Sequence, residues 1–482
     1  MNYGIVLKVL GSILILESIL MTPSLLISLY TNQADKLAFL ITILITGAIG
    51  FGLTRNRSRD RHINAKEGLA IVSLGWVSIS LLGALPLYIS GSTPTYIDAF
   101  FEIVSGFTTT GATVIANVEV LPMGILFWRS FTHWIGGMGI LVFTLSLLPA
   151  LGIGAFQIFK AESPGPIAGK IAPRIKDTAK ILYITYFTIT IIQVILLKFG
   201  GMSLFDSLVY TFGTVGTGGF ATKNASVGAY NSTYIHLVIG SFMVLSGVNF
   251  SLYYSLFKGK VKDVFRDEEL RLYFAIVFIS VTVIAINLFK TTYSSIGLAF
   301  RDSFFQVGSI MTTTGYSTAN FDMWPTFSKA ILLLLMFIGA SAGSTAGGMK
   351  VIRILVILKL IKREILKIFH PRAVKPVKLN DKILPNETIA GINSFTGLYM
   401  IIFVLSTILV SLEGVDLESA ASSVAATLGN IGPGLGVVGP TSTFNGYSQI
   451  SKAFFSLLML LGRLELFTLI ALFAPKNWRR EI

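Results

Sequence analysis

The chain has 482 residues, of which 53% are apolar and only 13% are charged. This composition excludes a water-soluble globular protein as the main architecture, and the lack of cysteine excludes disulfides and thiolate metal sites. The formal charge of +14 is spread over short loops between apolar stretches, which argues against a nucleic-acid-binding face.

Several apolar stretches approach the roughly 20 residues that a helix needs to cross a bilayer. Examples are residues 37–53, 69–89, 181–197 and 396–412, and we predict ten crossings along the chain. The first apolar stretch, 5–29, is long and carries Lys8 and Glu17. We therefore interpret it as a membrane helix and not as a cleavable signal.

Basic residues fill alternate loops of the predicted topology. Lys and Arg gather in residues 55–66, 160–180, 258–271 and 359–378. The intervening connections are nearly free of Lys and Arg or carry acids; they lie near Thr31, Ser92, Lys223, Asp322 and Glu413. The positive-inside rule therefore predicts that both termini are cytoplasmic, in agreement with an even number of crossings.

One pattern occurs four times: an acidic residue opens a short apolar segment that ends in a cluster of Thr and Gly. A glycine follows the acid after 13, 12, 13 and 14 residues, in the pairs Asp98 and Gly111, Asp206 and Gly218, Asp302 and Gly315, and Glu418 and Gly432. In the second copy Gly216 is an alternative alignment, and spacing favours Gly218. Small residues also let membrane helices pack closely, but that alternative does not explain four copies at matched spacing.

Each segment is too short to cross the bilayer, so we expect it to enter and return between two helices. Irregular backbone at membrane depth must be buried in protein or line a watery cavity, and four such segments predict one central pathway. Potassium filters are rings of backbone carbonyls, and glycine allows the positive φ angles that such rings need. The predicted filter comprises Thr109, Thr110, Gly111, Thr217, Gly218, Thr313, Thr314, Gly315, Asn430, Ile431 and Gly432.

The fourth copy differs chemically from the others, because Ile431 precedes its glycine and Pro433 follows. Selectivity over sodium is therefore less firmly predicted than potassium passage. In each copy we expect the acid to stabilise the positive end of a short helix, with the negative end facing the cation.

The predicted fold class is an all-α integral membrane protein with ten transmembrane helices. Four pseudo-fourfold helix, pore loop and helix repeats surround one central pore, and two extra helices precede them. The expected boundaries are 1–60 for the N-terminal helices and 61–155, 156–260, 261–370 and 371–482 for the four repeats.

A glycine-rich stretch interrupts the long apolar segment 327–362 of the third repeat. Glycine costs about 1 kcal/mol relative to alanine inside a helix, so we expect the helix to break there. In the last helix Arg463 stands in apolar sequence, where an ionisable residue is expensive. We hypothesise a gate formed by Gly339, Ala340, Ser341, Ala342, Gly343, Ser344, Thr345, Ala346, Gly347, Gly348 and Arg463. Close helix packing and an interhelix ion pair are the alternatives.

With these motifs the chain resembles the TrkH/TrkG branch of the Trk/Ktr/HKT superfamily of potassium transporters. Further motifs that carry the resemblance are FWRSFTHWIGGMGI (127–140), KAESPGP (160–166), PRIKDTAK (173–180), SAGSTAGGMK (341–350) and LGRLELFTL (461–469). The resemblance favours the gate and implies potassium as the transported ion. It also implies a homodimer, a TrkA-type cytoplasmic nucleotide-binding regulator and a location in a prokaryotic plasma membrane.

The expected function is channel-like potassium uptake, and the expected enzyme activity is none. A weakly selective potassium and sodium pathway, or a proton- or sodium-coupled symporter, is the alternative. The segment 434–439 matches GxGxxG but follows a predicted loop and no strand, so we expect nucleotide only through a partner subunit. His133 is predicted to lie near a membrane boundary, and Glu465 is predicted to pair away from Arg463.

Overall fold

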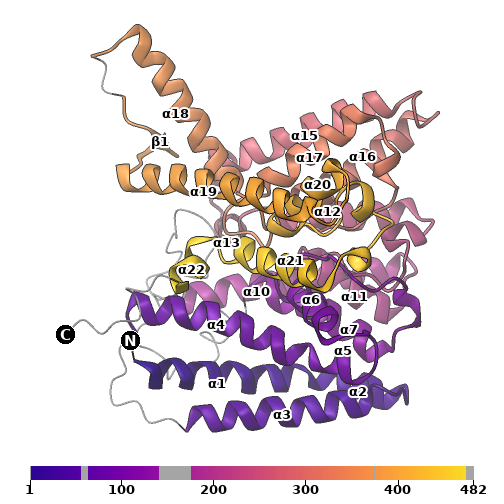
Figure 1. Ribbon diagram of the computed structural model, residues 1–482. Coiled ribbons are helices and arrows are strands. Elements are labelled where there is room, and N and C mark those ends of the chain that lie inside the picture. The colour runs from indigo at the N-terminus through magenta and orange to yellow at the C-terminus, as the bar shows by residue number, and fades with distance from the viewer. Residues whose placement is uncertain (1, 56–62, 140–174, 373–374, 474–482) are drawn as a thin grey trace.

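The computed structural model describes residues 2–55, 63–139, 175–372 and 375–473 (Figure 1). The motif at 160–166 and much of the basic loop around it lie outside the described residues. The described part is mostly helical, and most of its long helices run roughly side by side (Figure 1).

The first helices form one edge of the molecule (Figure 1). They are α1 (Tyr3–Leu20), α2 (Thr22–Tyr30), α3 (Lys36–Thr54), α4 (Ala65–Gly83) and α5 (Leu85–Ile89). Helices α1 and α3 approach closely at two glycines: a Cβ on Gly50 would lie 2.8 Å from the Gly11 carbonyl oxygen, and one on Gly11 would lie 2.6 Å from the Gly50 oxygen. Small residues let these two backbones touch.

The rest of the described chain contains both long and short helices. The elements are α6 (Tyr96–Phe107), α7 (Met123–Gly137), α10 (Ile175–Phe199), α11 (Leu204–Val215), α12 (Thr233–Ser246), α13 (Phe250–Phe257), α14 (Val261–Arg266), α15 (Glu268–Leu288), α16 (Ile296–Met311), α17 (Thr326–Ile338), α18 (Val351–Phe369), α19 (Asn386–Ser411), α20 (Leu417–Leu428), α21 (Gln449–Arg463) and α22 (Phe467–Ile470). The two short strands β1 (Lys378–Leu379) and β2 (Lys382–Ile383) form an antiparallel hairpin.

Six helices in the described residues are long and apolar enough to cross a membrane, or seven with the pair α12 and α13, which is bent by 93°. The ten predicted crossings are therefore not all full-length helices. The returning helices α7, α12, α17 and α21 have only 15, 14, 13 and 15 residues. Helices α7, α12 and α17 end at or next to a glycine. Helix α21 ends at Arg463, shortly before Glu465 and Leu466, which have positive φ.

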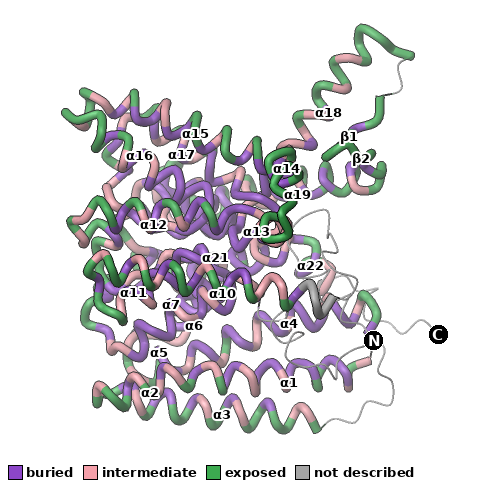
Figure 2. Tube along the Cα trace, turned by 180° about the vertical axis from the view of Figure 1, so that it is seen from behind, coloured by how far each residue is buried: buried purple, intermediate pink, exposed green. Residues whose placement is uncertain are grey.

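The burial pattern reverses that of a soluble protein. The short helices α6, α11, α16 and α20 are buried over their last turns, and the Ser and Thr side chains in those turns are buried as well (Figure 2). Outer helices expose large apolar side chains instead, such as Leu44 on α3, Phe278 on α15 and Ile408 on α19, which are 63%, 69% and 58% exposed. A lipid environment accounts for this distribution, because apolar side chains face hydrocarbon at no cost there.

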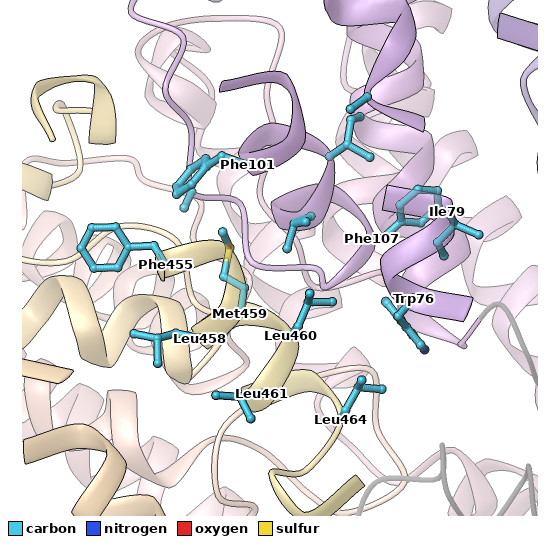
Figure 3. Packing of buried hydrophobic residues seen from close by; sticks show 14 of the residues in the cluster. Trp76, Ile79, Phe101, Phe107, Phe455, Leu458, Met459, Leu460, Leu461 and Leu464 are labelled. Atoms are coloured by element: carbon cyan, nitrogen blue, oxygen red, sulfur yellow. The ribbon is translucent and has the colours of Figure 1, made fainter. Parts of the chain in front are cut away.

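An apolar cluster joins the first and last parts of the chain. Trp76 and Ile79 of α4 and Phe101 and Phe107 of α6 gather beside the α21 side chains Phe455, Leu458, Met459, Leu460 and Leu461 (Figure 3). This cluster joins α4 and α6, near the start of the chain, to α21, near its end.

The close approach of α1 and α3 yields a stability prediction with an internal control. We expect Gly50→Ala to lower the unfolding midpoint in detergent, because the new Cβ meets backbone atoms that cannot yield, at a cost of about 1–3 kcal/mol. On the same helix, Gly52 has open space around it, so Gly52→Ala should leave the midpoint unchanged or raise it. Equal midpoints for the two variants would contradict this interpretation.

Candidate functional site

The four short helices end in the same turn. The N–H groups of Thr110, Gly218, Thr314 and Ile431 donate to the carbonyl five residues earlier, at 2.9, 2.7, 2.8 and 2.8 Å. The residue before each of them has positive φ: 55° at Thr109, 56° at Thr217, 55° at Thr313 and 55° at Asn430. This is a Schellman-type helix end with Thr or Asn in the place that glycine usually takes. A β-branched residue with positive φ is a genuine outlier, and three of the four are threonines.

A glycine with positive φ follows two residues later in every turn. The four are Gly111, Gly219, Gly315 and Gly432, with φ of 80°, 83°, 81° and 99°. In the second loop the matching glycine is therefore Gly219, and the predicted alignment on Gly218 is wrong by one residue. Gly218 takes the place that Thr110, Thr314 and Ile431 hold in the other loops. With Gly219 the distance from Asp206 becomes 13 residues, as in the first and third loops.

These glycines link the four loops into a closed circuit. A Cβ on Gly111 would lie 1.9 Å from the carbonyl oxygen of Gly218, one on Gly219 would lie 2.1 Å from that of Thr314, and one on Gly315 would lie 2.2 Å from that of Ile431. A Cβ on Gly432 would lie 2.6 Å from the oxygen of Thr110 and complete the circuit. The structure thus brings together all four predicted Thr and Gly clusters, and each of the four carbonyl oxygens lies against the next loop.

A pocket opens onto this circuit from one side. Its lining includes Gly111, Gly219, Gly315 and Gly432, one from each loop, together with the segments that follow them. Among the described residues no group of three or more His, Asp or Glu could hold a metal ion. The four turns carry backbone carbonyl oxygens, threonine hydroxyls and the amide oxygen of Asn430.

The acids that open the predicted segments take two different positions. Asp98, Asp206 and Glu418 lie in the first turn of α6, α11 and α20. Asp302 does not, because α16 begins earlier, at Ile296; it bonds Arg301 at 2.9 Å instead. The expected helix-end stabilisation is therefore wrong for the third copy.

The glycine-rich segment 339–348 lies next to the closed circuit of loops. Helix α17 ends at Ile338 and α18 begins at Val351, with positive φ at Gly339, Gly343 and Gly348 between them. Ala340, Ser341, Ala342, Ser344, Thr345, Ala346 and Gly347 are buried.

Residues of three of the four loops contact this segment. Gly347 N–H donates to Thr313 Oγ1 at 2.8 Å, and Thr345 Oγ1 donates to Val215 O at 3.1 Å. A Cβ on Gly347 would lie 2.5 Å from Gly429 O. The segment therefore lies against the second, third and fourth loops at the points where their short helices end.

Arg463 joins the first loop to this segment. Its Nη1 donates to Thr345 O at 2.8 Å and lies 3.4 Å from Thr109 Oγ1, while Nη2 donates to Gly137 O at 2.9 Å. Glu465 pairs with Arg353 at 2.5 Å, which is a partner other than Arg463, as predicted. The guanidinium thus lies next to Thr109, the residue with positive φ in the first loop.

Three buried residues near the loops and this segment escape sequence reasoning. Lys350 is only 2% exposed, and its ammonium bonds to Ala346 O. Glu269 of α15 accepts N–H bonds from Ala342 at 2.7 Å and from Ile352 at 3.1 Å, and so connects the segment to the first turn of α18. His133 is fully buried, with contacts to Gly106 of α6 and to Phe220 after the second loop, while its position near a membrane boundary stays a prediction. An acid in a helix's first turn gives no sequence signal that it caps another segment.

The family model described as "Cation transport protein", TrkH, matches residues 35–480. The chain belongs to the TrkH family. The Trk system potassium uptake protein TrkH of Escherichia coli strain K12 is 40% identical over 99% of this chain and its own full length. TrkG of the same strain, also named a Trk system potassium uptake protein, is 35% identical over 98% of both chains.

Structural comparison gives the same family. The crystal structure of the potassium transporter TrkH from Vibrio parahaemolyticus matches with a TM-score of 0.89 and 36% identity, over 99% of this chain and all of that one. The two TrkH-family chains therefore share their fold from end to end. The relatives are named as transporters, not as enzymes.

The Glu269 contacts predict how the buried segment is held. We expect Glu269→Ala to speed amide hydrogen exchange across residues 342–352, because it leaves two buried N–H groups without an acceptor, at about 1–3 kcal/mol each. Glu269→Gln keeps an acceptor oxygen and should stay close to the wild-type rate. Equal exchange in wild type and the alanine variant would show that Glu269 does not hold the segment.

Proposed function

We propose that this chain is a potassium uptake protein whose ions pass through the closed circuit of four loops. The observation that carries the proposal is that circuit, in which a glycine of each loop lies against a carbonyl oxygen of the next. Dehydrating an alkali cation requires several oxygens at short range, and backbone carbonyls from four loops supply them. The relatives named as Trk potassium uptake proteins support potassium as the ion.

The filter would consist of the residues predicted from sequence, with Gly219 added to the second loop. The four short helices end at the filter, so their partly negative carboxyl ends favour a cation there. Ile431 and Gly218 stand where the other two loops have threonine, so only two of the four positions add a hydroxyl at this level. Carbonyl oxygens, which all four loops share, would therefore carry the coordination.

The architecture that fits this function is four repeats around one pore, preceded by α1 to α3. The repeats would keep the boundaries 61–155, 156–260, 261–370 and 371–482, each with one short buried helix, after N-terminal helices in 1–60. Ten crossings fit this scheme if the short returning helices span with their irregular ends buried in protein.

Ion flux into liposomes that hold the purified protein tests the filter. Wild type should carry potassium faster than sodium. Gly315→Ser should lower the potassium to sodium flux ratio by at least about tenfold, because the new side chain displaces the Ile431 carbonyl by which the third loop meets the fourth. Gly297→Ser, at an open position near the start of α16, is the matched control and should behave as wild type.

Other outcomes of the same experiment separate the alternatives. Equal wild-type flux of both ions would contradict the selective filter and support a weakly selective pathway. Flux that requires an imposed proton or sodium gradient would support a coupled symporter.

The gate in this proposal is the segment 339–348 together with Arg463. Its contacts with the second, third and fourth loops support it, since a segment in that place lies across the inner end of the filter. Arg463 adds a positive charge below Thr109, and a cation leaving the filter would meet it in a poorly solvated place.

Removing the charge should open the resting pathway. We expect Arg463→Ala to raise potassium flux in the absence of any partner by about tenfold, which corresponds to about 1.4 kcal/mol of lost barrier. Arg463→Lys keeps the charge and should raise flux less. Unchanged flux in the alanine variant would rule out the electrostatic barrier.

Regulation and placement complete the proposal. The name "Trk system" of the relatives supports a regulatory partner, and we propose a TrkA-type cytoplasmic subunit that binds the nucleotide. A basic helix, α18, projects from the body with Lys362 and Lys367 exposed and could meet such a subunit (Figure 1). We further propose a homodimer in a prokaryotic plasma membrane, with both termini cytoplasmic.

A further inference from the structure

Phe220, which follows Gly219 in the second loop, is held by three side chains from two other parts of the chain, α7 and the third loop. It follows Gly219, whose Cα lies against the Thr314 carbonyl of the third loop. Phe220 is 3% exposed. Its N–H group, its carbonyl oxygen and its ring each have a separate buried contact.

His133 of α7 holds the Phe220 N–H group. Phe220 N donates to His133 Nε2 at 3.2 Å, so Nε2 is unprotonated. Nδ1 then carries the proton and donates to Gly106 O at 2.8 Å, near the end of α6. The neutral imidazole thus connects the helix before the first loop to the residue that follows the second filter glycine.

Arg129, one turn earlier on α7, lies over the Phe220 ring at 4.2 Å from guanidinium carbon to ring centroid. Its charge is paired with Glu102 of α6, and both side chains are buried. Glu102 also accepts bonds from Thr113 Oγ1 at 2.9 Å and from Val114 N–H at 3.1 Å. These two residues follow Gly111, so the ion pair holds both the segment that leaves the first loop and the Phe220 ring of the second loop.

Tyr316 holds the Phe220 carbonyl from the third loop. It follows Gly315 directly, and its hydroxyl lies 3.1 Å from Phe220 O and 3.1 Å from Tyr210 O. At the corresponding position the fourth loop has Pro433, which has no N–H group or hydroxyl to offer.

We propose that Arg129, His133 and Tyr316 are positioning residues that set potassium over sodium selectivity by fixing Phe220, and with it Gly219. This inference rests on the proposed function. Sodium is the smaller ion, so a ring of carbonyl oxygens that can contract accommodates it. The three contacts with Phe220 restrain the second loop and so oppose that contraction. None of the three side chains needs to touch the ion.

The test measures the potassium to sodium flux ratio of three single variants of the full-length protein in liposomes. Tyr316→Phe removes only the hydroxyl, and we expect the potassium to sodium flux ratio to fall about fivefold, the value of one buried hydrogen bond, while potassium flux stays within about twofold of wild type. Tyr399→Phe is the control: its hydroxyl on α19 is buried without a hydrogen-bond partner, and the ratio should not change. Phe220→Leu keeps the backbone bonds, removes the ring under Arg129 and should lower the ratio too.

The outcomes separate this inference from the proposed function. An unchanged ratio in both Tyr316→Phe and Phe220→Leu, with a selective wild type, would overturn the inference alone. A parallel loss of both fluxes at a constant ratio would also overturn it, because it would show a purely structural role. A wild-type protein that does not distinguish the two ions would overturn the proposed function and this inference together.

Discussion

At the centre of the molecule, the carbonyl oxygen of one loop occupies the place where the next loop would carry a Cβ. This close approach recurs at Gly111, Gly219, Gly315 and Gly432, and it requires glycine at all four positions for space as well as for positive φ. The threonines and the asparagine two residues earlier have positive φ as well, and such backbone costs about 1–3 kcal/mol per residue. Strain of this kind persists only where the surroundings enforce it, and the four residues with this backbone, Thr109, Thr217, Thr313 and Asn430, are all fully buried.

The surrounding architecture follows from enclosing these turns. Short helices that carry Ser and Thr must be covered by protein, and the outer helices provide the cover while presenting apolar side chains outward. The returning helices stop early because the chain must close under the loops, most clearly where α17 gives way to the segment 339–348. Glu269, Lys350 and Arg463 then satisfy backbone groups of that irregular segment, as buried backbone requires.

Much of this is visible in the sequence for identifiable reasons. The four loops stand out because they need Gly and Thr at fixed distances from a helix start, and the interruption of α17 and α18 stands out because glycines gather there. The register of the second loop is not visible, since Gly218 and Gly219 are adjacent and only φ separates them. Helix length misleads as well, because apolar composition continues through the irregular ends of the short returning helices. The contacts of Glu269 and His133 join residues 73 and 87 positions apart and leave no local pattern.

The central claim is that a cation binds where the four loops meet. Anomalous diffraction from crystals grown with rubidium or thallium in place of potassium tests it directly, because either ion is visible by itself. The account predicts a peak among the carbonyl oxygens of Thr110, Gly218, Thr314 and Ile431, absent from crystals grown in sodium. Density only outside this circuit, or no difference between the rubidium and sodium crystals, would contradict the account.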